Sequence, residues 1–340
     1  MVLIRNKKTL VLFAITVFFF IVMALVRPEQ FLSIRVFQSM AVQIPEFGLL
    51  ALAIAICMIT GGIDLSVVAI SNLTGIATAW MLTTYVPPET AAGASILRII
   101  LIMLIAIIIA LACGAINGLL ITRLGITPIL ATLGTMGLFG GIGVIVTKGK
   151  GIVGLPGPFL WLGTAVIGNV VPIQLIIFLA VILIVGLILN RTLFGFNLFM
   201  IGANPIAARF SGININNVLL RTYMFSGLLS GIAGFLIISK ADSARSGYAA
   251  SFLLPAVLVA VLGGIDPTGG FGNVTGVVLA LVLVQTLKTG FNILSFSSFF
   301  QNIILGGMLL LVMVVNYIGA NLAHRINTRR ELAKHMELNK

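Results

Sequence analysis

The chain has 340 residues, of which 60% are apolar and only 8% are Asp, Glu, Lys or Arg. Soluble domains carry about 25% charged residues, so this composition excludes a soluble enzyme, a nucleic-acid-binding domain and a disordered chain. It predicts an all-α, polytopic membrane protein, because its apolar runs have the length of bilayer-spanning helices.

The formal net charge of +12 comes from 20 basic and 8 acidic residues, and the positions of the basic residues matter more than their number. Arg5, Lys7 and Lys8 precede the first apolar run, and further basic residues follow the last one. Because cytoplasmic segments of membrane proteins retain Lys and Arg, we expect both termini in the cytoplasm and an even number of crossings. The expected partner of this charge is membrane lipid, with no nucleic acid.

Ten apolar runs follow one another along the chain, and a spanning helix needs about 20 apolar residues. The run 253–263 is too short to span, which predicts a broken or re-entrant segment. We therefore expect about ten transmembrane helices in one domain over 1–340, with a cytoplasmic loop at 191–216 and a basic cytoplasmic tail at 319–340. The runs are 9–26, 36–60, 66–85, 94–121, 126–147, 171–190, 217–240, 253–263, 272–289 and 299–318.

Two helix breaks share four letters, Gly-Gly-Ile-Asp, at 61–64 and at 263–266. Paired glycines release the backbone from a helix, and non-helical backbone at membrane depth survives only inside protein or beside a water-filled cavity. Paired interrupted segments in a transporter often mark its pathway. The alternative for the first break is a cytoplasmic turn in which Asp64 or Ser66 caps the next helix. The candidate gate residues are Gly61, Gly62, Asp64, Gly263, Gly264 and Asp266.

The loop 191–216 contains a predicted short helix, with Asn204 as N-cap, Pro205 at its first position and Gly212 as its stop. Apolar residues recur within it at helical spacing, so an apolar stripe lies outside the spans. Such a stripe either contacts a partner protein or lies flat on the membrane surface. The residues of interest are Asn204, Ile206, Ala207, Ala208, Arg209, Phe210 and Gly212.

Polar side chains within the spans are the candidates for a pathway, because a polyhydroxylated ligand needs hydrogen-bonding groups along its route. Buried amides also commonly bridge helices, and this alternative applies to each of them. Gln285 and Asn292 are favoured because they flank Gly290 in the half with the re-entrant segment. The candidates are Asn72, Asn117, Thr135, Gln285 and Asn292.

Glu46 is an acid within the second apolar run, and an intramembrane acid is a functional candidate by default. Since Pro45 precedes it, the helix is instead expected to begin there, with Glu46 in its first turn near water. An enzyme is not expected, because both histidines, His324 and His335, lie in the C-terminal tail. The two cysteines lie inside apolar runs, so no metal site is expected either.

Five stretches in order resemble the membrane subunits (permeases) of ATP-binding-cassette importers for simple sugars, the ribose/xylose/galactose/autoinducer-2 group. They are Ile-Thr-Gly-Gly-Ile-Asp-Leu-Ser-Val at 59–67, Ile-Asn-Gly-Leu-Leu-Ile-Thr-Arg-Leu-Gly-Ile-Thr-Pro at 116–128, Ala-Thr-Leu-Gly-Thr-Met at 131–136, Gly-Ala-Asn-Pro-Ile-Ala-Ala-Arg-Phe-Ser-Gly-Ile-Asn at 202–214, and Val-Leu-Gly-Gly at 261–264 with Gly-Gly-Phe-Gly at 269–272. The stretch Ser-Ala-Arg-Ser at 243–246, followed by Leu-Leu-Pro-Ala at 253–256, looks more like a permease of the autoinducer-2 importers.

The resemblance implies a multi-pass protein of the bacterial inner membrane that works with several partners. Two permeases, identical or homologous, would form the pathway, and a periplasmic binding protein would deliver the ligand. Each permease would offer a coupling helix, here 204–213, to a cytoplasmic ATP-binding subunit. That partner would hold ATP and Mg, because this chain has no phosphate-loop motif and needs no cofactor. The alternative is a secondary transporter driven by an ion gradient, a class that usually places several acids in mid-membrane.

Overall fold

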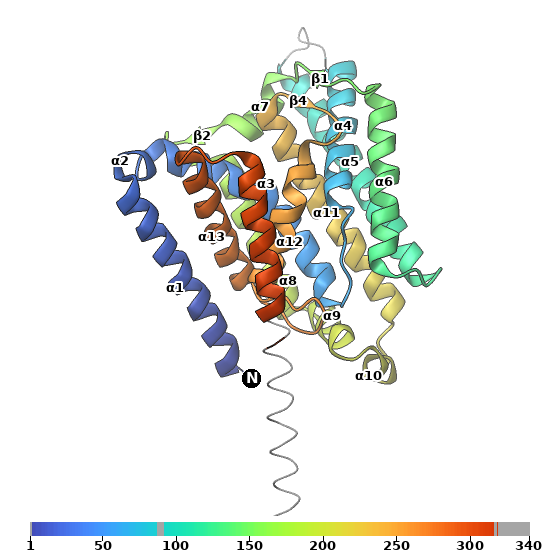
Figure 1. The fold of residues 1–340 in the computed structure, drawn as a ribbon. Helices are drawn as coiled ribbons and strands as arrows, with labels where there is room; N and C mark the ends of the chain where they lie inside the picture. Colours follow the sequence, from blue (N-terminus) through green and yellow to red (C-terminus); the bar gives the residue numbers. More distant parts are fainter. Residues whose placement is uncertain (1, 87–91, 316–317, 319–340) are drawn as a thin grey trace, which may run out of the picture.

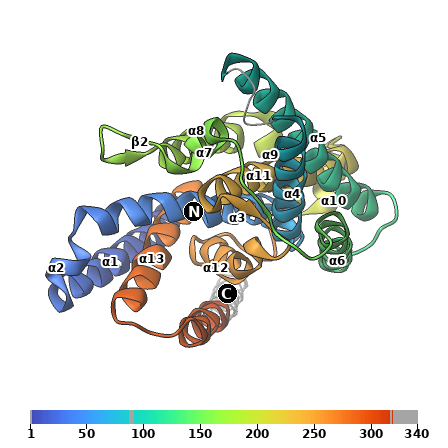
Figure 2. The same ribbon diagram turned by 90° about the horizontal axis from the view of Figure 1, so that it is seen from above.

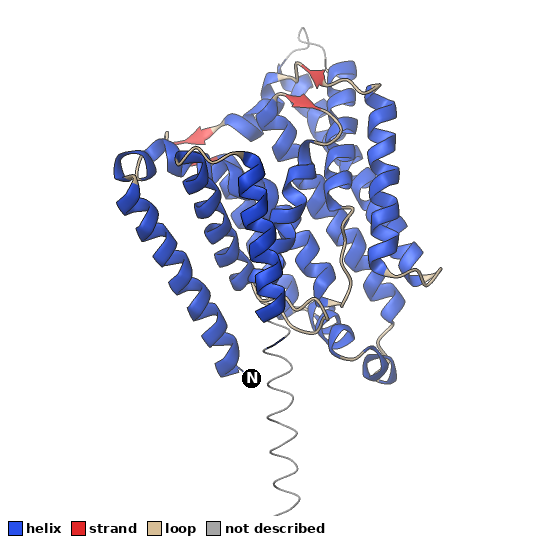
Figure 3. Cartoon of the chain, in the orientation of Figure 1, coloured by secondary structure: helices blue, strands red, loops and turns tan. Residues whose placement is uncertain are grey.

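The computed structural model describes residues 2–86, 92–315 and 318, so the predicted basic tail at 319–340 lies outside the described residues. Figure 3 shows that the described chain is helical almost throughout, with two short pairs of strands. This arrangement confirms the all-α prediction. The four strands have two residues each and lie in the connections, where they pair antiparallel.

The first half of the described chain contains α1 (Val2–Val26), α2 (Pro28–Phe31), α3 (Ile34–Ile59), α4 (Val67–Tyr85), α5 (Ala92–Thr122), α6 (Pro128–Thr147), β1 (Ile152–Val153), α7 (Gly157–Thr164), β2 (Val166–Ile167) and β3 (Val171–Pro172). The second half contains α8 (Ile173–Arg191), α9 (Leu193–Ala203), α10 (Pro205–Phe210), α11 (Ile215–Ala241), β4 (Ser243–Ala244), the 3-10 helix η1 (Tyr248–Phe252), α12 (Leu253–Leu262) and α13 (Val274–Ile293). A further helix follows at Ser298–Val315.

Nine helices of the described residues are long and apolar enough to cross a membrane. The short run 253–263 forms α12, and the chain continues from it through an irregular segment before α13 begins. Figure 1 shows α10 and the start of α1 at one end of the bundle, which we call the α10 face, and α7 at the opposite end, the α7 face. Helix Ser298–Val315 ends on the α10 face, so its end and the start of α1 lie on the same side of the bundle.

Helix α11 lies at the centre of the bundle, in contact with α3, α4, α5 and α7 (Figure 2). Glycines permit the closest of these approaches. A Cβ at Gly114 of α5 would overlap the Tyr223 carbonyl of α11, and a Cβ at Gly227 of α11 would overlap the Ala110 carbonyl of α5. Close backbone packing of this kind replaces the hydrophobic effect as the attraction between helices in lipid.

Candidate functional site

The first break carries a buried acid into the interior of the bundle. Residues 60–66 leave α3 at the α10 face and rise into the bundle, so that α4 begins well inside it (Figure 1). The carboxylate of Asp64 is fully buried and accepts hydrogen bonds from the Ser66 backbone N–H at 3.0 Å and the Ser66 Oγ at 2.6 Å. It also accepts one from the Ser226 Oγ of α11 at 2.8 Å. This geometry does not fit the alternative of a capped turn at the surface.

Side chains of two further helices extend this arrangement into what we call the Asp64 network: Asp64, Ser66, Asn117, Thr135 and Ser226. The Asn117 Nδ2 of α5 donates to the Ser66 Oγ at 2.7 Å, and the Thr135 Oγ1 of α6 donates to the Asn117 Oδ1 at 2.6 Å. The break is therefore held by α5, α6 and α11 together. Asn117 and Thr135 keep their predicted place within the spans, but each has a partner from another element.

Gly62 of the first break lies against Tyr223 of α11, whose ring is fully buried. A Cβ at Gly62 would come within 2.5 Å of the Tyr223 hydroxyl oxygen and 3.2 Å of Pro128 at the start of α6. The Tyr223 hydroxyl has no hydrogen-bond partner within the described part of the chain. The break thus fits between α6 and α11 only because position 62 has no side chain.

The second break repeats the local pattern of the first nearer the surface. The half-buried Asp266 accepts hydrogen bonds from the Thr268 backbone N–H at 2.9 Å and the Thr268 Oγ1 at 2.7 Å. Gly264 adopts a φ of +83°, which a residue with a side chain rarely adopts. Gly263 packs against the backbone of Gly276 and Val277, so α12 ends directly on the first turn of α13.

The two breaks meet at a contact of four glycines, which we call the glycine junction: Gly61, Gly202, Gly269 and Gly270. The Gly270 backbone N–H donates to the Ile59 carbonyl at the end of α3, at 2.8 Å. A Cβ at Gly202 would overlap that same carbonyl and the Gly270 nitrogen, and a Cβ at Gly269 would lie 2.7 Å from the Gly61 nitrogen. Gly202 belongs to the last turn of α9, so the junction brings both breaks against the chain that enters α10.

Helix α10 follows the junction directly. The Asn204 Oδ1 accepts hydrogen bonds from the backbone N–H groups of Ile206 and Ala207, both at 3.0 Å, which confirms the predicted N-cap. Gly212 has a φ of +79° and follows the end of the helix, as predicted for its stop. Ala208 is buried, whereas Ile206 and Phe210 are 69% and 89% exposed. The apolar stripe is therefore uncovered, with Arg209 exposed beside it.

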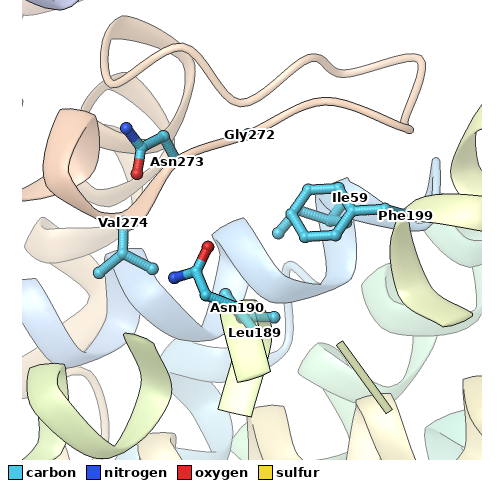
Figure 4. Close-up of a pocket in the computed structure, with 7 residues that line it drawn as sticks. All are labelled: Ile59, Leu189, Asn190, Phe199, Gly272, Asn273 and Val274. Atoms are coloured by element: carbon cyan, nitrogen blue, oxygen red, sulfur yellow. The ribbon is translucent and has the colours of Figure 1, made fainter. Parts of the chain in front are cut away.

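A small recess lies beside the glycine junction, and Figure 4 shows the side chains that surround it. Its volume of about 10 Å³ is room for no more than about one water molecule. It therefore holds no sugar-sized ligand. Its lining comes from α3, α8, α9 and the start of α13, and consists of Ile59, Leu189, Asn190, Phe199, Gly272, Asn273 and Val274.

The other predicted pathway amides also have partners within the chain. The Asn72 Oδ1 of α4 accepts from the Ala249 backbone N–H at 2.9 Å, which ties α4 to η1. The Gln285 Nε2 donates to the Thr289 Oγ1 at 3.1 Å and to the Gln43 Oε1 of α3 at 3.3 Å. The Asn292 Oδ1 accepts from Gln301 at 2.8 Å. Each of them bridges helices or turns, and their contact with a ligand stays a prediction.

The expectation for Glu46 is wrong, because α3 runs unbroken from Ile34 and includes Pro45. Glu46 lies near the middle of this helix, where its carboxylate pairs with the Lys240 Nζ of α11 at 2.9 Å. Lys288 of α13 is a further residue that the sequence patterns did not single out, and its ammonium lies over the rings of Phe47 and Phe252. A single lysine within the apolar run 272–289 was the signal that could have revealed it.

The chain is similar in sequence to a family of permeases and to several curated relatives. Residues 36–313 match a family described as the branched-chain amino acid transport system permease component. The autoinducer 2 import system permease protein LsrD of Yersinia enterocolitica is 34% identical over 274 residues, covering 78% of this chain and 79% of that protein. LsrD of Yersinia pseudotuberculosis strain IP 31758 is 33% identical and covers 78% of each chain. LsrD of Escherichia coli K12 is 34% identical, covering 78% of this chain and 79% of that protein. No solved structure matches the chain.

Proposed function

The chain belongs to the family of permease components described for branched-chain amino acid transport systems, and from this membership we propose how its parts work. It is the transmembrane pathway subunit of an ATP-binding-cassette importer and a multi-pass protein of the bacterial inner membrane. Its relatives in Yersinia and Escherichia are named for the import of autoinducer 2. We propose that this chain likewise passes a small polyhydroxylated ligand, autoinducer 2 or a simple sugar. Transport driven by an ion gradient is not favoured by these relatives.

The cytoplasmic ATP-binding subunit docks on α10 in this proposal. An exposed isoleucine and phenylalanine on a six-residue helix outside the spans are apolar surface that a partner would cover. Arg209 beside them supplies a charged contact at the rim. ATP and Mg belong to the docked subunit, and a second permease and a periplasmic binding protein complete the assembly.

The observation that carries the proposal is the glycine junction between α10 and both breaks. Because backbone touches backbone there, a movement of α10 has no flexible side chain to absorb it. A shift of α10 on ATP binding therefore displaces the end of α3 and the segment between α12 and α13 together. The Asp64 network and the Asp266 turn are the two gate elements that this displacement reaches.

Docking is tested by substituting Ile206→Glu in the complex expressed with its ATP-binding subunit. We expect the ATP-binding subunit to be lost from the purified complex, because a carboxylate would be buried in an apolar contact. Leu124→Glu is the matched control, since Leu124 is 68% exposed, against 69% for Ile206, in the connection between α5 and α6. Copurification is measured by the ratio of the two subunits on a gel. Retention of the ATP-binding subunit by Ile206→Glu would contradict the proposal.

A further inference from the structure

Three charged side chains from three different helices lie on the side of the α7 face, with Glu46 buried, Lys288 half-buried and Lys240 exposed. Glu46 of α3 has a side chain only 6% exposed, and its carboxylate lies 2.9 Å from the Lys240 Nζ near the end of α11. The Lys288 ammonium of α13 lies over the ring of Phe47, the residue next to Glu46 on α3. Charged groups within the membrane are costly, so they are kept where they serve a function. We call Glu46, Phe47, Lys240, Phe252 and Lys288 the charged cluster.

The charges in this cluster do not balance. The Glu46–Lys240 pair is neutral, which leaves the ammonium of Lys288 as an excess positive charge. That ammonium lies 5.0 Å from the ring centroid of Phe47 and 5.6 Å from that of Phe252, and the two rings stack at 6.3 Å. It donates no hydrogen bond to any of the residues that the structure describes. A lysine ammonium has three donors, so this site has hydrogen-bonding capacity that the rings leave unused.

An unused acceptor lies one turn earlier on the same helix. Gln285 precedes Lys288 by three residues, and side chains at that spacing lie on neighbouring positions of a helix. Its Nε2 is occupied by Gln43 and Thr289, but its Oε1 is buried without a partner in the described part of the chain. Buried polar atoms are almost always hydrogen-bonded, and an exception calls for a group that satisfies it.

Snorkelling toward the membrane surface does not account for Lys288. A snorkelling lysine extends its ammonium toward water along the nearest surface. Lys288 instead turns its ammonium toward rings of α3 and η1, and Phe47 is fully buried. The side chain is therefore directed toward α3, the helix that supplies Glu46 and Gln43, and toward η1.

We propose that the charged cluster, together with Gln285, is a binding site for the polyhydroxylated ligand on its way through the permease. The Lys288 ammonium donates to ligand hydroxyl oxygens, the Gln285 Oε1 accepts from a ligand hydroxyl, and the half-buried ring of Phe252 packs against the ligand carbons. An excess positive charge disfavours cationic solutes, and an apolar solute would leave both polar groups unpaired. This inference rests on the proposed function and names where the ligand is recognised.

The test uses the whole importer, reconstituted in liposomes with its ATP-binding subunit, second permease and binding protein, and autoinducer 2 as the transported probe. Lys288→Met keeps an unbranched apolar stem and removes the ammonium with its charge. We expect the KM for uptake to rise about tenfold or more, as for the loss of a hydrogen bond to a charged group. Copurification of the ATP-binding subunit measures whether the variant importer assembles, so that a change in KM is read only from assembled complexes. Lys288→Arg is expected to restore most of the uptake.

Lys150→Met is the matched control, because Lys150 is an exposed lysine in the connection after α6 on the α7 face. Gln285→Met is a second variant that leaves the charge in place, and we expect it to raise the KM in the same direction. Uptake by Lys288→Met with an unchanged KM would overturn the binding site while leaving the proposed function intact. Absence of ATP-dependent uptake by the unmodified importer would instead overturn the proposed function.

Discussion

The two breaks have the same four letters and the same local turn, but the bundle treats them differently. In both, an aspartate accepts hydrogen bonds from the backbone and hydroxyl of the residue two positions later, Ser66 or Thr268. Asp64 then gains Ser226 of α11 and is fully buried, whereas Asp266 is half-buried. The local sequence thus determines the turn, and the surrounding helices determine how deeply its aspartate is buried and how many hydrogen bonds it accepts.

The difference suggests two roles within one mechanism. The first break is fixed to α5, α6 and α11 through the Asp64 network, so it moves only when those helices move. The second break rests on backbone contacts at the glycine junction and on the start of α13. We infer that both breaks take up the movement of α10 and that the Asp64 network limits how far the first break moves, which gives the gate a defined closed state.

The largest effect is expected where the two breaks are joined. In Gly202→Val the new side chain would overlap the Ile59 carbonyl and the Gly270 nitrogen, neither of which has room to move. We expect the free energy of unfolding to fall by about 4 kcal/mol or more, with loss of the assembled complex. The measurement is the thermal midpoint of the protein purified in detergent.

Gly186→Val is the control for that substitution, because a Cβ at Gly186 on α8 meets no atom of the described structure within 4 Å. Its stability is expected to stay within about 1 kcal/mol of the unmodified protein. Equal thermal midpoints for Gly202→Val and Gly186→Val would show that the backbones do not pack closely at the glycine junction.

A smaller effect distinguishes the two aspartates themselves. Asp64→Ala would leave the hydroxyls of Ser66 and Ser226 without their buried acceptor. We expect the free energy of unfolding to fall by about 3 kcal/mol. Asp266→Ala removes the side-chain acceptor of a turn near the surface, and we expect the free energy of unfolding to fall by about 1 kcal/mol. Thermal midpoints of the two variants, measured side by side, test the comparison. An equal fall in thermal midpoint for the two variants would mean that the helices around Asp64 do not stabilise its turn further.

Much of the fold follows from the sequence because the features that predict it are local. Run length predicted the spans, and Asn204, Pro205 and Gly212 predicted the short helix α10, since caps and stops depend on neighbouring residues. The depth of the first break was not predictable in this way. It depends on Ser226, 162 residues from Asp64, which appears in the sequence as one small residue of an apolar helix.

The candidate site shows the same limit. Asn117 and Gln285 were recognised as polar residues within spans, but their partners come from distant segments of the chain. The expectation for Glu46 is wrong because Pro45 lies inside α3 and does not begin a helix. In the membrane a proline is tolerated inside a helix when neighbouring helices satisfy the freed carbonyl. The acid that pairs with Lys240 likewise lies on a distant segment of the chain, α3.

Helix α10 and the second break are expected to move as one unit when ATP binds. This expectation is tested by spin labels on Ile206→Cys and Phe271→Cys, with Cys57 and Cys113 replaced by Ala, in the whole importer with and without ATP. A second pair, Ile206→Cys and Leu124→Cys, reports movement of α10 relative to the connection between α5 and α6. We expect the 206–271 distance distribution to stay the same while the 206–124 distribution shifts. A shift of the 206–271 distribution as large as that of 206–124 would contradict it.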